Sequence, residues 1–566
     1  MFNKAVCEDA KKRFPPNVTC STAHSLAYKI YGSQLRHKLS TKLRPHDIVQ
    51  HLQHNVGSHL QVHSYAKQVL CTIEAFVASA DLELESEHVP IMHSDTKTPI
   101  EAEDRAKILK DSLQIWKKMI DRNDKSTRIT HDVYLKLYQL SMPKFDDYHC
   151  IMVDEAQDCN PAMLAIVMLQ NLPVIVVGDP NQQIYGFRGA RNAIQNLAAT
   201  HTYHLTKSFR FGPEIAYIAN CCLEVLKFNA VQTLVGIRKP SYVNGKTEGQ
   251  YAIIARSNAQ LFNEAIRLCC LKRFRGHEPT NIQGAFAGGI RGYGFDQMLD
   301  IYKLSTHRNG QAPKFSDKFI SRFKSYKDLC NYAKSVDDNE LLTKIDLVNQ
   351  HTSNLPDYLK IINEKCSYPM ELANIVFSTA HKSKGLEFDT VCLTDDYVLV
   401  HGAEFRRRRP IDFEESNVLY VALTRAKRSL LLPDKLLRVL LLAQEKFEYP
   451  KLGTKVLGDK TEIECIHCLQ AFTPHTVMVL VRRKLVTASG RPIPGGPLCV
   501  KCATEPTVRP RLTVEPVVMY LDPTADYAHR SMACFVGPLP SDPPIVRENF
   551  EDFNDMGVVY VINLHM

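Results

Sequence analysis

The sequence predicts an α/β protein with parallel sheets, and three apolar runs support that fold class. Residues 150–153 have the composition of a strand buried on both faces, which is typical of parallel sheets. A helical segment at 161–170 leads to a second apolar run at 174–177, so strand, helix and strand should form a right-handed parallel unit. A third run at 252–255 opens a second region of the same class.

Acidic residues follow both strands of the first unit. Asp154 and Glu155 come directly after the first strand, and Asp179 follows the second. Ligands of an open α/β sheet collect at the carboxyl ends of its strands, so these acids should lie along one edge. A magnesium nucleotide needs one carboxylate near the metal and another that orients or deprotonates the attacking water. Asp154 fits the first role and Glu155 the second; a strand that simply ends in two solvated acids is the alternative.

The composition is that of a large globular protein. With 566 residues the chain is long enough for several domains with cores of their own. Its net charge of +9, from 70 basic and 61 acidic residues, weakly favours a polyanionic partner. No run is apolar enough to span a membrane, and the N-terminus lacks the apolar core of a signal peptide. Seventeen cysteines without such a signal indicate reduced thiols in the cytosol or nucleus.

The loop after the second strand combines residue types that rarely occur together in a loop. Between 180 and 190 it holds an amide at Gln182, aromatic rings at Tyr185 and Phe187, and a guanidinium at Arg188. This loop and the acidic stretch before it resemble motifs III and II of the UvrD-like superfamily 1 DNA helicases. The resemblance implies that Gln182 senses the nucleotide γ-phosphate, while the aromatic rings and the arginine contact single-stranded DNA.

The first residues resemble two further motifs of that family. Residues 1–4 look like the end of motif Ia, and residues 21–28 resemble motif Ib. The threonine and histidine of motif Ib touch the DNA backbone in the family, which carries over to Thr22 and His24. Ala23 stands where the family usually has phenylalanine, so no base contact is implied there. A helix-capping or surface histidine is the alternative for His24.

Two more segments resemble motifs IV and V. Arg210 ends the strand-like run 204–210 and, by resemblance, is an arginine finger at the γ-phosphate, where its planar fork suits phosphate oxygens. A surface salt bridge is the alternative for this residue. In the segment 380–389, the resemblance gives His381 a nucleic-acid contact and Glu387 a contact with the nucleotide sugar.

Residues 414–427 resemble motif VI and supply Arg425 as the second arginine at the γ-phosphate. The helix expected there places four apolar residues on one face and turns Arg425 outward from that face. Those residues are Leu419, Ala422, Leu423 and Ala426.

The resemblance implies two RecA-like P-loop NTPase motor domains, the first of them N-terminally truncated, with helical insertions and a small C-terminal zinc-binding region. The expected parts are 1–42 with 147–243 for the first motor domain, 43–146 for its insertion, 244–285 with 371–445 for the second motor domain, 286–370 for its insertion, and 446–566 for the C-terminal region.

Two CxxC pairs predict a structural zinc site in the last part of the chain. Cys465 and Cys468 form one pair, and Cys499 and Cys502 form the other. Each pair can present two thiolates to one tetrahedral Zn²⁺ ion. Chance pairing among seventeen cysteines is the alternative.

Six blocks in family order predict an ATP-dependent DNA helicase that uses Mg²⁺ and moves 3′ to 5′ on single-stranded or forked DNA. Within the family the chain resembles the F-box DNA helicases. That likeness implies a nuclear protein of DNA repair that restrains homologous recombination. It also implies recombinase filaments and a cullin-type ubiquitin ligase as partners, and no membrane.

One motif of the family is not found. No GxxxxGK[ST] loop, which cradles phosphates with backbone N–H groups and a lysine, occurs in the 566 residues. We therefore expect the chain alone not to be a competent ATPase, and its first motor domain to be less stable than its second. The alternative hypothesis is a DNA- or protein-binding remnant without ATPase activity.

Overall fold

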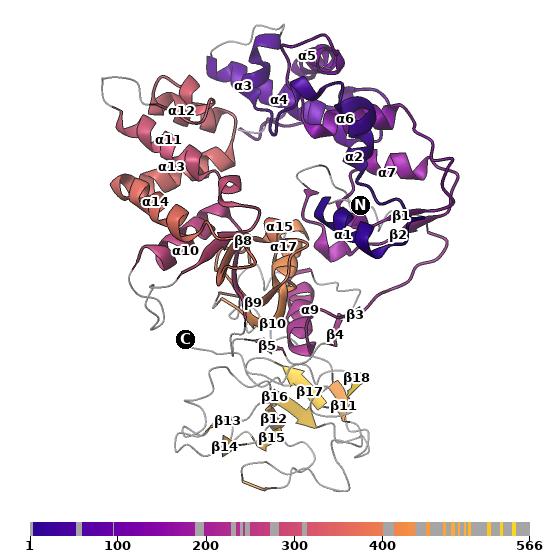
Figure 1. The fold of residues 1–566 in the computed structure, drawn as a ribbon, viewed down its shortest axis with the longest axis vertical. Helices are drawn as coiled ribbons and strands as arrows, with labels where there is room; N and C mark the ends of the chain where they lie inside the picture. Colours follow the sequence, from indigo (N-terminus) through magenta and orange to yellow (C-terminus); the bar gives the residue numbers. More distant parts are fainter. Residues whose placement is uncertain are drawn as a thin grey trace. The chain divides into compact units, whose positions relative to one another are not determined.

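The computed structural model comprises two compact units, each built from two segments of the chain (Figure 1). The first unit is Met1–Thr200 with Gly294–Leu359, and the second is His201–Tyr293 with Lys360–Met566. The structure describes residues 4–399 and 413–436, and beyond them only residues 468–470 and short strands. The gaps are 53–58, 94–95, 187–188, 190–196, 198, 228–233, 238–240, 244–248, 272–281, 308–313 and 434.

A parallel pair of strands carries the acidic residues of the first unit. β1 (Ile151–Val153) pairs with β2 (Val174–Val176), and α7 (Pro161–Met168) connects them. Asn160 caps α7 because its side-chain oxygen accepts a hydrogen bond from the Met163 N–H. The predicted order of strand, helix and strand is therefore confirmed, and both strands end at the same edge.

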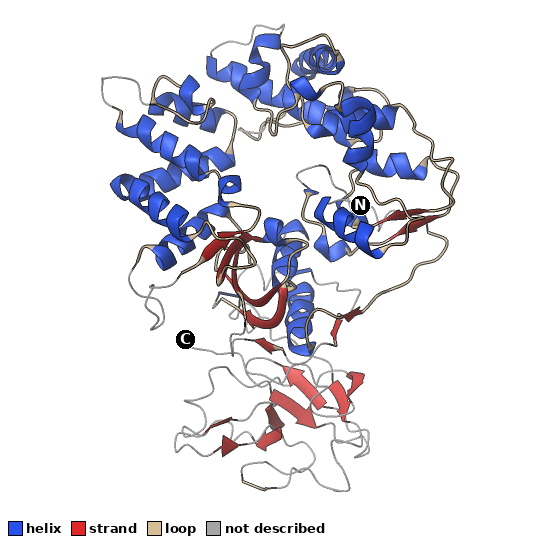
Figure 2. Ribbon diagram, viewed as in Figure 1, coloured by secondary structure: helices blue, strands red, loops and turns tan. Residues whose placement is uncertain are grey.

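Helices make up most of the remaining first unit (Figure 2). α4 (His59–Ala78) and α5 (Ala102–Ile120) share a core in which the rings of Phe76 and Trp116 meet edge to face at 5.2 Å. α6 (His131–Leu140) packs its apolar side against β1 and α7, with Leu135 and Tyr138 beside Val153. The helices before β1 are α1 (Lys4–Arg13), α2 (Ala23–Ala27), α3 (Pro45–Ile48), α4 (His59–Ala78), α5 (Ala102–Ile120) and α6 (His131–Leu140).

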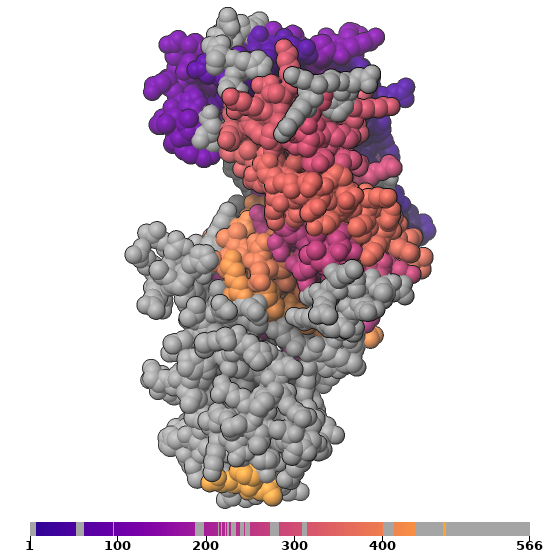
Figure 3. Space-filling view, turned by 90° about the vertical axis from the view of Figure 1, so that its left-hand side faces the viewer, coloured from indigo at the N-terminus to yellow at the C-terminus, as the bar shows by residue number. Residues whose placement is uncertain are grey.

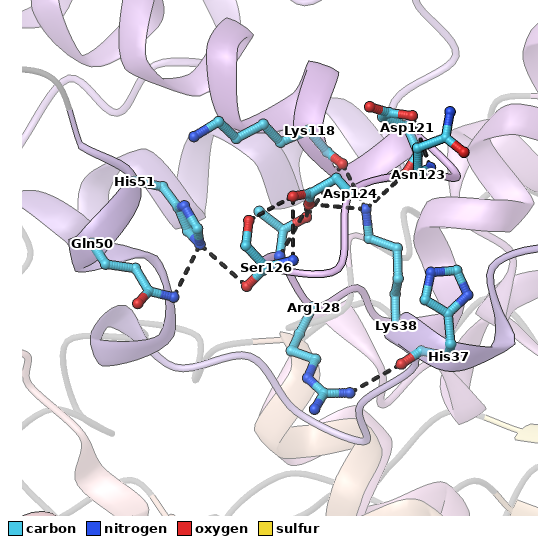
Figure 4. A network of polar contacts seen from close by, with 11 residues as sticks. His37, Lys38, Gln50, His51, Lys118, Asp121, Asn123, Asp124, Ser126 and Arg128 are labelled. Atoms are coloured by element: carbon cyan, nitrogen blue, oxygen red, sulfur yellow. Dashed lines mark hydrogen bonds and ion pairs between the residues drawn. The ribbon is translucent and has the colours of Figure 1, made fainter.

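A buried lysine closes the C-terminal end of α5 (Figure 4). The Lys38 side chain is fully buried and donates to the carbonyl oxygens of Lys118 and Asp121 at 2.6 and 2.9 Å. It also pairs with the Asp124 carboxylate at 3.2 Å. The last carbonyls of a helix have no partner within the helix and carry partial negative charge. The Lys38 ammonium group supplies these carbonyls with both a hydrogen-bond donor and a positive charge.

Residues 294–359 contain a second group of helices that packs within the first unit. They are α11 (Phe295–Thr306), α12 (Tyr326–Ser335) and α13 (Asn339–His351). Lys42 pairs with Glu340 at 2.8 Å, and the Arg44 guanidinium lies 3.6 Å above the Phe319 ring. The two segments therefore lie side by side on the surface (Figure 3). The sequence predicted residues 286–370 as a helical insertion of the second motor domain, and that domain assignment stays a prediction.

The second unit contains a six-stranded sheet in which every pair of neighbours is parallel. Its strand order is β5 (Tyr242–Val243), β10 (Ala426–Leu431), β9 (Phe388–Leu393), β6 (Tyr251–Ala255), β8 (Ile375–Thr379) and β7 (Gly284–Phe286). Its helices are α9 (Pro213–Lys227), α10 (Asn258–Cys269), α15 (Ala380–Ser383) and α17 (Phe413–Leu423), while α14 (Leu355–Lys365) begins in the first unit's segment. A short parallel pair, β3 (Lys207–Ser208) and β4 (Val235–Gly236), lies in the same unit.

Beyond residue 448 the described residues are nearly all in short strands. They are β11 (Tyr449–Leu452), β12 (Val477–Val481), β13 (Leu485–Val486), β14 (Pro492–Ile493), β15 (Gly496–Cys499), β16 (Val518–Leu521), β17 (Met532–Phe535) and β18 (Val546–Phe550). Nowhere in the described part of the chain is a helix both apolar and long enough to cross a bilayer.

Candidate nucleotide and nucleic-acid sites

The chain turns sharply where β1 ends. Glu155 has left-handed backbone angles, with φ of 55° and ψ of 41°, which a residue with a side chain seldom adopts. The next N–H, that of Ala156, donates to the Val177 carbonyl at 3.1 Å, and the Val177 N–H donates to the Val153 carbonyl at 2.8 Å. The turn is thus fastened to the strand beside it, which holds the Glu155 carboxylate at the edge of the sheet.

A chain of hydrogen bonds joins the two predicted motifs at this edge. The Gln157 amide donates to the Glu155 carboxylate, and its oxygen accepts from the Asp179 N–H at 3.1 Å. The Asp179 carboxylate in turn accepts from the Asn181 N–H and from the Gln182 side-chain amide, both at 2.9 Å. Sequence reasoning missed Gln157; its only signal was an amide placed between acidic residues.

The carboxylates at this edge suit magnesium chemistry. Burial raises the pKa of Asp154, and the negative charge of Glu155 raises it further. Within the described residues, no group of three His, Cys, Asp or Glu side chains is close enough to hold a metal ion. Mg²⁺ commonly binds through one or two carboxylates, with phosphate oxygens and water completing its shell. Asp154 with Glu155 beside it fits that pattern.

The DNA-contact residues predicted in the following loop are only partly within the described residues. Tyr185 is half-buried there. Phe187 and Arg188 lie outside the described residues. Gly189, one residue further on, has a φ of 75°, and its Cα lies so near Ala78 that an added Cβ would sit 2.6 Å from the Ala78 methyl. Glycine therefore permits the close approach of this loop to α4.

Arg210 and Glu387, both predicted to contact the nucleotide, are hydrogen-bonded to each other in the second unit. The Arg210 Nε donates to a Glu387 carboxylate oxygen at 3.0 Å, and its Nη1 donates to the Thr424 carbonyl at 2.9 Å. The guanidinium is 29% exposed and the carboxylate 50% exposed, so both remain accessible to a ligand. Three segments distant in sequence, which resemble motifs IV, V and VI, are thereby brought together.

Arg425 is not turned outward, and that part of the sequence prediction is wrong. Its side chain is almost completely buried, and α17 ends at Leu423 while β10 already begins at Ala426. The guanidinium donates to the Val421 carbonyl at 2.8 Å and the Leu386 carbonyl at 3.4 Å. The free carbonyls at a helix C-terminus attract a cation, and a buried charge needs such partners, so the arginine folds back onto the helix end.

His381 lies on α15, at the carboxyl end of β8, where Thr379 caps the helix by accepting from the Lys382 N–H. Lys382 donates to the Gly292 carbonyl at 2.8 Å and lies 3.3 Å above the Tyr293 ring. Burial lowers the pKa of Lys382 to about 8. Gly385 has a φ of 82°, which permits the tight turn between α15 and β9, where the Leu386 N–H donates to the Ser383 carbonyl at 2.9 Å.

The residues of the motif Ib segment make local structural contacts. Thr22 is the N-cap of α2: its hydroxyl accepts from the Ser25 N–H at 3.1 Å, and its own N–H donates to the Ser25 hydroxyl at 3.2 Å. His24 hydrogen-bonds the Asp132 carboxylate at 2.9 Å and stacks edge to face on Tyr134. A capping box and a carboxylate partner are the simpler roles here, and DNA contacts by Thr22 and His24 stay a prediction.

The predicted zinc ligands fall almost entirely outside the described residues. Cys465 and Cys502 are not described, and of Cys499 only the strand backbone is. Cys468 is described and exposed.

Comparisons with known proteins agree with these two parallel sheets and their motifs. Residues 3–202 match the UvrD/REP helicase N-terminal domain, and residues 203–433 match the UvrD-like helicase C-terminal domain. The chain belongs to the UvrD-like helicase family, as its motifs predicted. Such domains imply two RecA-like α/β motor domains, to which the sheets of the two units correspond.

Two of the proteins to which the chain is similar are named F-box DNA helicases. F-box DNA helicase 1 of Gallus gallus is 36% identical over 551 residues, which are 92% of this chain and 53% of the relative. F-box DNA helicase protein 1 of Schizosaccharomyces pombe is 30% identical over 477 residues, 77% of this chain and 52% of the relative. ATP-dependent DNA helicase UvrD2 of Mycobacterium tuberculosis is 24% identical over 337 residues, which are 50% of this chain and 47% of the relative. The chain spans about half the length of these relatives.

Proposed function

We propose that the chain is the motor part of an ATP-dependent DNA helicase that moves 3′ to 5′ along single-stranded DNA. The observation that supports this best is the bonded series from Glu155 through Gln157 and Asp179 to Gln182, which lies at a strand edge in a chain of the UvrD-like family. This series of hydrogen bonds links the proposed catalytic base, Glu155, to the proposed γ-phosphate contact, Gln182, which supports the proposal.

In this proposal Asp154 holds Mg²⁺, and bound MgATP supplies the phosphoryl group whose transfer to water drives movement. Glu155 accepts the proton of the attacking water. In the first unit Gln182 senses the γ-phosphate. In the second unit Arg210 takes its developing charge and Glu387 hydrogen-bonds the nucleotide sugar, while Arg425 would take part only after leaving the Val421 and Leu386 carbonyls that it now bonds. Before nucleotide arrives, Glu387 and the Thr424 carbonyl hold the Arg210 guanidinium in place.

For DNA, the proposed contacts are backbone contacts by Thr22, His24 and His381, with stacking by Tyr185 and Phe187. Arg188 adds charge beside the rings. Stacking on aromatic rings tolerates any base sequence, which suits a motor that travels along a strand. We expect Phe187→Ala to weaken single-strand binding by about 1–3 kcal/mol, whereas unchanged affinity would assign this ring to the core.

The finer setting of this activity rests on the F-box relatives named above. We propose a nuclear protein of DNA repair that restrains homologous recombination. Its partners would be forked DNA, recombinase filaments and a cullin-type ubiquitin ligase. Co-purification of cullin with the full-length protein tests the last of these partners.

We also propose that Cys465, Cys468, Cys499 and Cys502 bind one structural Zn²⁺ ion, on the strength of their two CxxC spacings. Elemental analysis of purified protein should find one zinc per chain, and Cys499→Ser should abolish it. Protein without zinc would refute this site.

Hydrolysis of ATP stimulated by single-stranded DNA tests the proposed function. The 566 residues contain no GxxxxGK[ST] sequence, so the assay uses both the chain itself and the chain joined to the phosphate-binding loop segment of a UvrD-like relative. We expect DNA-stimulated turnover in at least one form, and its loss by several orders of magnitude in Glu155→Gln, which leaves Asp154 in place. No turnover in either form would favour a binding protein without ATPase activity.

A further inference from the structure

Gln157 is the buried residue through which the two acidic strand ends are connected. Its side chain is completely buried, although it lies within three residues of Asp154, which lines the sheet edge. A buried amide must use both its ends, because an unsatisfied group there costs the full desolvation penalty. Gln157 meets this requirement with one partner from each motif.

The partners fix which way the amide points. The Asp179 N–H can only donate, so the group facing it must be the Gln157 oxygen. The Gln157 nitrogen therefore faces Glu155 and donates to its carboxylate. Glutamic acid at this position would still accept from Asp179 but would set a second carboxylate against Glu155. Leucine would leave both partners without this contact.

From Asp179 the connection continues into the following loop. The Asp179 N–H donates to the Gln157 side-chain oxygen. The two Asp179 carboxylate oxygens accept hydrogen bonds from the Asn181 N–H and the Gln182 amide. A shift of Gln157 would therefore move Glu155 and Gln182 together. Displacement of reacting groups by about 1 Å can cost on the order of 100-fold in rate.

We propose that Gln157 is a positioning residue that sets the Glu155 carboxylate and the Gln182 amide relative to each other. It touches neither nucleotide nor DNA, and it acts through these two side chains. This inference rests on the proposed function for its catalytic consequence, but its structural part concerns only contacts within the first unit.

Hydrogen exchange of the 566-residue chain tests the structural part without any nucleotide. In Gln157→Leu, the amide of Asp179 and the segment 178–186 should exchange up to about tenfold faster, the effect expected from one lost hydrogen bond. Gln157→Glu should keep the protection at Asp179. The matched control is Gln170→Leu, because Gln170 likewise accepts from a backbone N–H, that of Phe145, and donates to two carbonyls. The control should leave 178–186 unchanged.

Turnover, in whichever form hydrolyses ATP, tests the catalytic part. Gln157→Leu should lower kcat by about 100-fold with little change in KM. Gln157→Glu should also lower kcat, because it replaces the amide that donates to Glu155 with a second carboxylate. Neither substitution at Gln157 should lower kcat much further when Glu155 is already replaced by Gln.

Equal exchange of 178–186 in Gln157→Leu and Gln170→Leu would overturn the inference, whether or not the chain proves to be an ATPase. Altered exchange with wild-type kcat would overturn the catalytic part. If neither form of the protein hydrolyses ATP, the proposed function fails, and the exchange pattern alone decides the role of Gln157.

Discussion

At the scale of single residues, arginine side chains show how far pattern reasoning reaches. The sequence motifs located Arg210 and Arg425, and the structure brings both near Thr424. Their environments differ, since Arg210 is partly exposed beside Glu387 whereas Arg425 is buried on helix-end carbonyls. Helical periodicity alone could not show this, because α17 ends two residues before Arg425.

Arg210→Ala should separate stability from activity. The Arg210–Glu387 pair is partly exposed, and such pairs contribute only about 0–1 kcal/mol, so thermal unfolding should change little. ATP turnover should fall about 1000-fold if the residue is an arginine finger. Arg267→Ala is the control, because Arg267 is 35% exposed and pairs with Glu264. Equal turnover in the two variants would reduce Arg210 to a surface salt bridge.

Gln157, in contrast, is a residue that the sequence motifs did not single out. Its importance depends on a backbone N–H 22 positions away, and no spacing rule reports such a contact. The carboxylates were predictable because parallel strands end at a common edge. The amide that links them became visible only once the register of β1 and β2 was known.

At the scale of elements, Lys38 makes a sharp stability prediction. Lys38→Met should destabilise the first unit by about 3 kcal/mol, because the buried lysine is lost and two helix-end carbonyls and the partly exposed Asp124 carboxylate are left without their cation. Chemical denaturation measures this change. Lys125→Met provides the control, since Lys125 is exposed, and it should stay within about 0.5 kcal/mol of wild type. A similar loss in both would deny Lys38 its capping role.

The contact of α13 with the N-terminal segment predicts a pH dependence. The Glu340 side chain is 53% exposed, and its partial desolvation opposes ionisation, but Lys344 and Lys42 outweigh this effect and lower the pKa of the carboxyl to about 2. A depressed carboxyl pKa stabilises the fold above the unfolded value, near 4.5, and this contribution disappears as pH falls from there to about 2. Glu340→Gln should therefore lower Tm at pH 7 and approach wild type at pH 3.

The exposed Glu83 provides the comparison for that titration. Glu83→Gln should follow wild type at every pH, whereas Glu340→Gln should differ from it fully above about pH 4.5 and progressively less as the pH falls towards 2. A constant difference between Glu340→Gln and wild type from pH 7 to pH 3 would contradict the assigned ion pairs.

At the scale of the whole molecule, strands can be predicted from local patterns, whereas the grouping of helices depends on contacts distant in sequence. Strands flanked by turns and acids are encoded within a few residues, as at β1, β2, β6 and β8. The assignment of residues 294–359 to the first unit depends instead on Lys42, Arg44 and Lys67, which bond to residues 250 or more positions away. Those contacts are set by packing and leave no trace in a sequence window.

Strand separation by the protein is the most direct test of the helicase proposal. A duplex with a 3′ single-stranded tail and one with a 5′ tail are compared, with ATP, in the form of the protein that hydrolyses it. We expect unwinding of the 3′-tailed duplex, none of the 5′-tailed one, and no unwinding by Glu155→Gln. ATP hydrolysis without strand separation or movement on either substrate would contradict a DNA helicase, and unwinding that survives Glu155→Gln would contradict the assigned site.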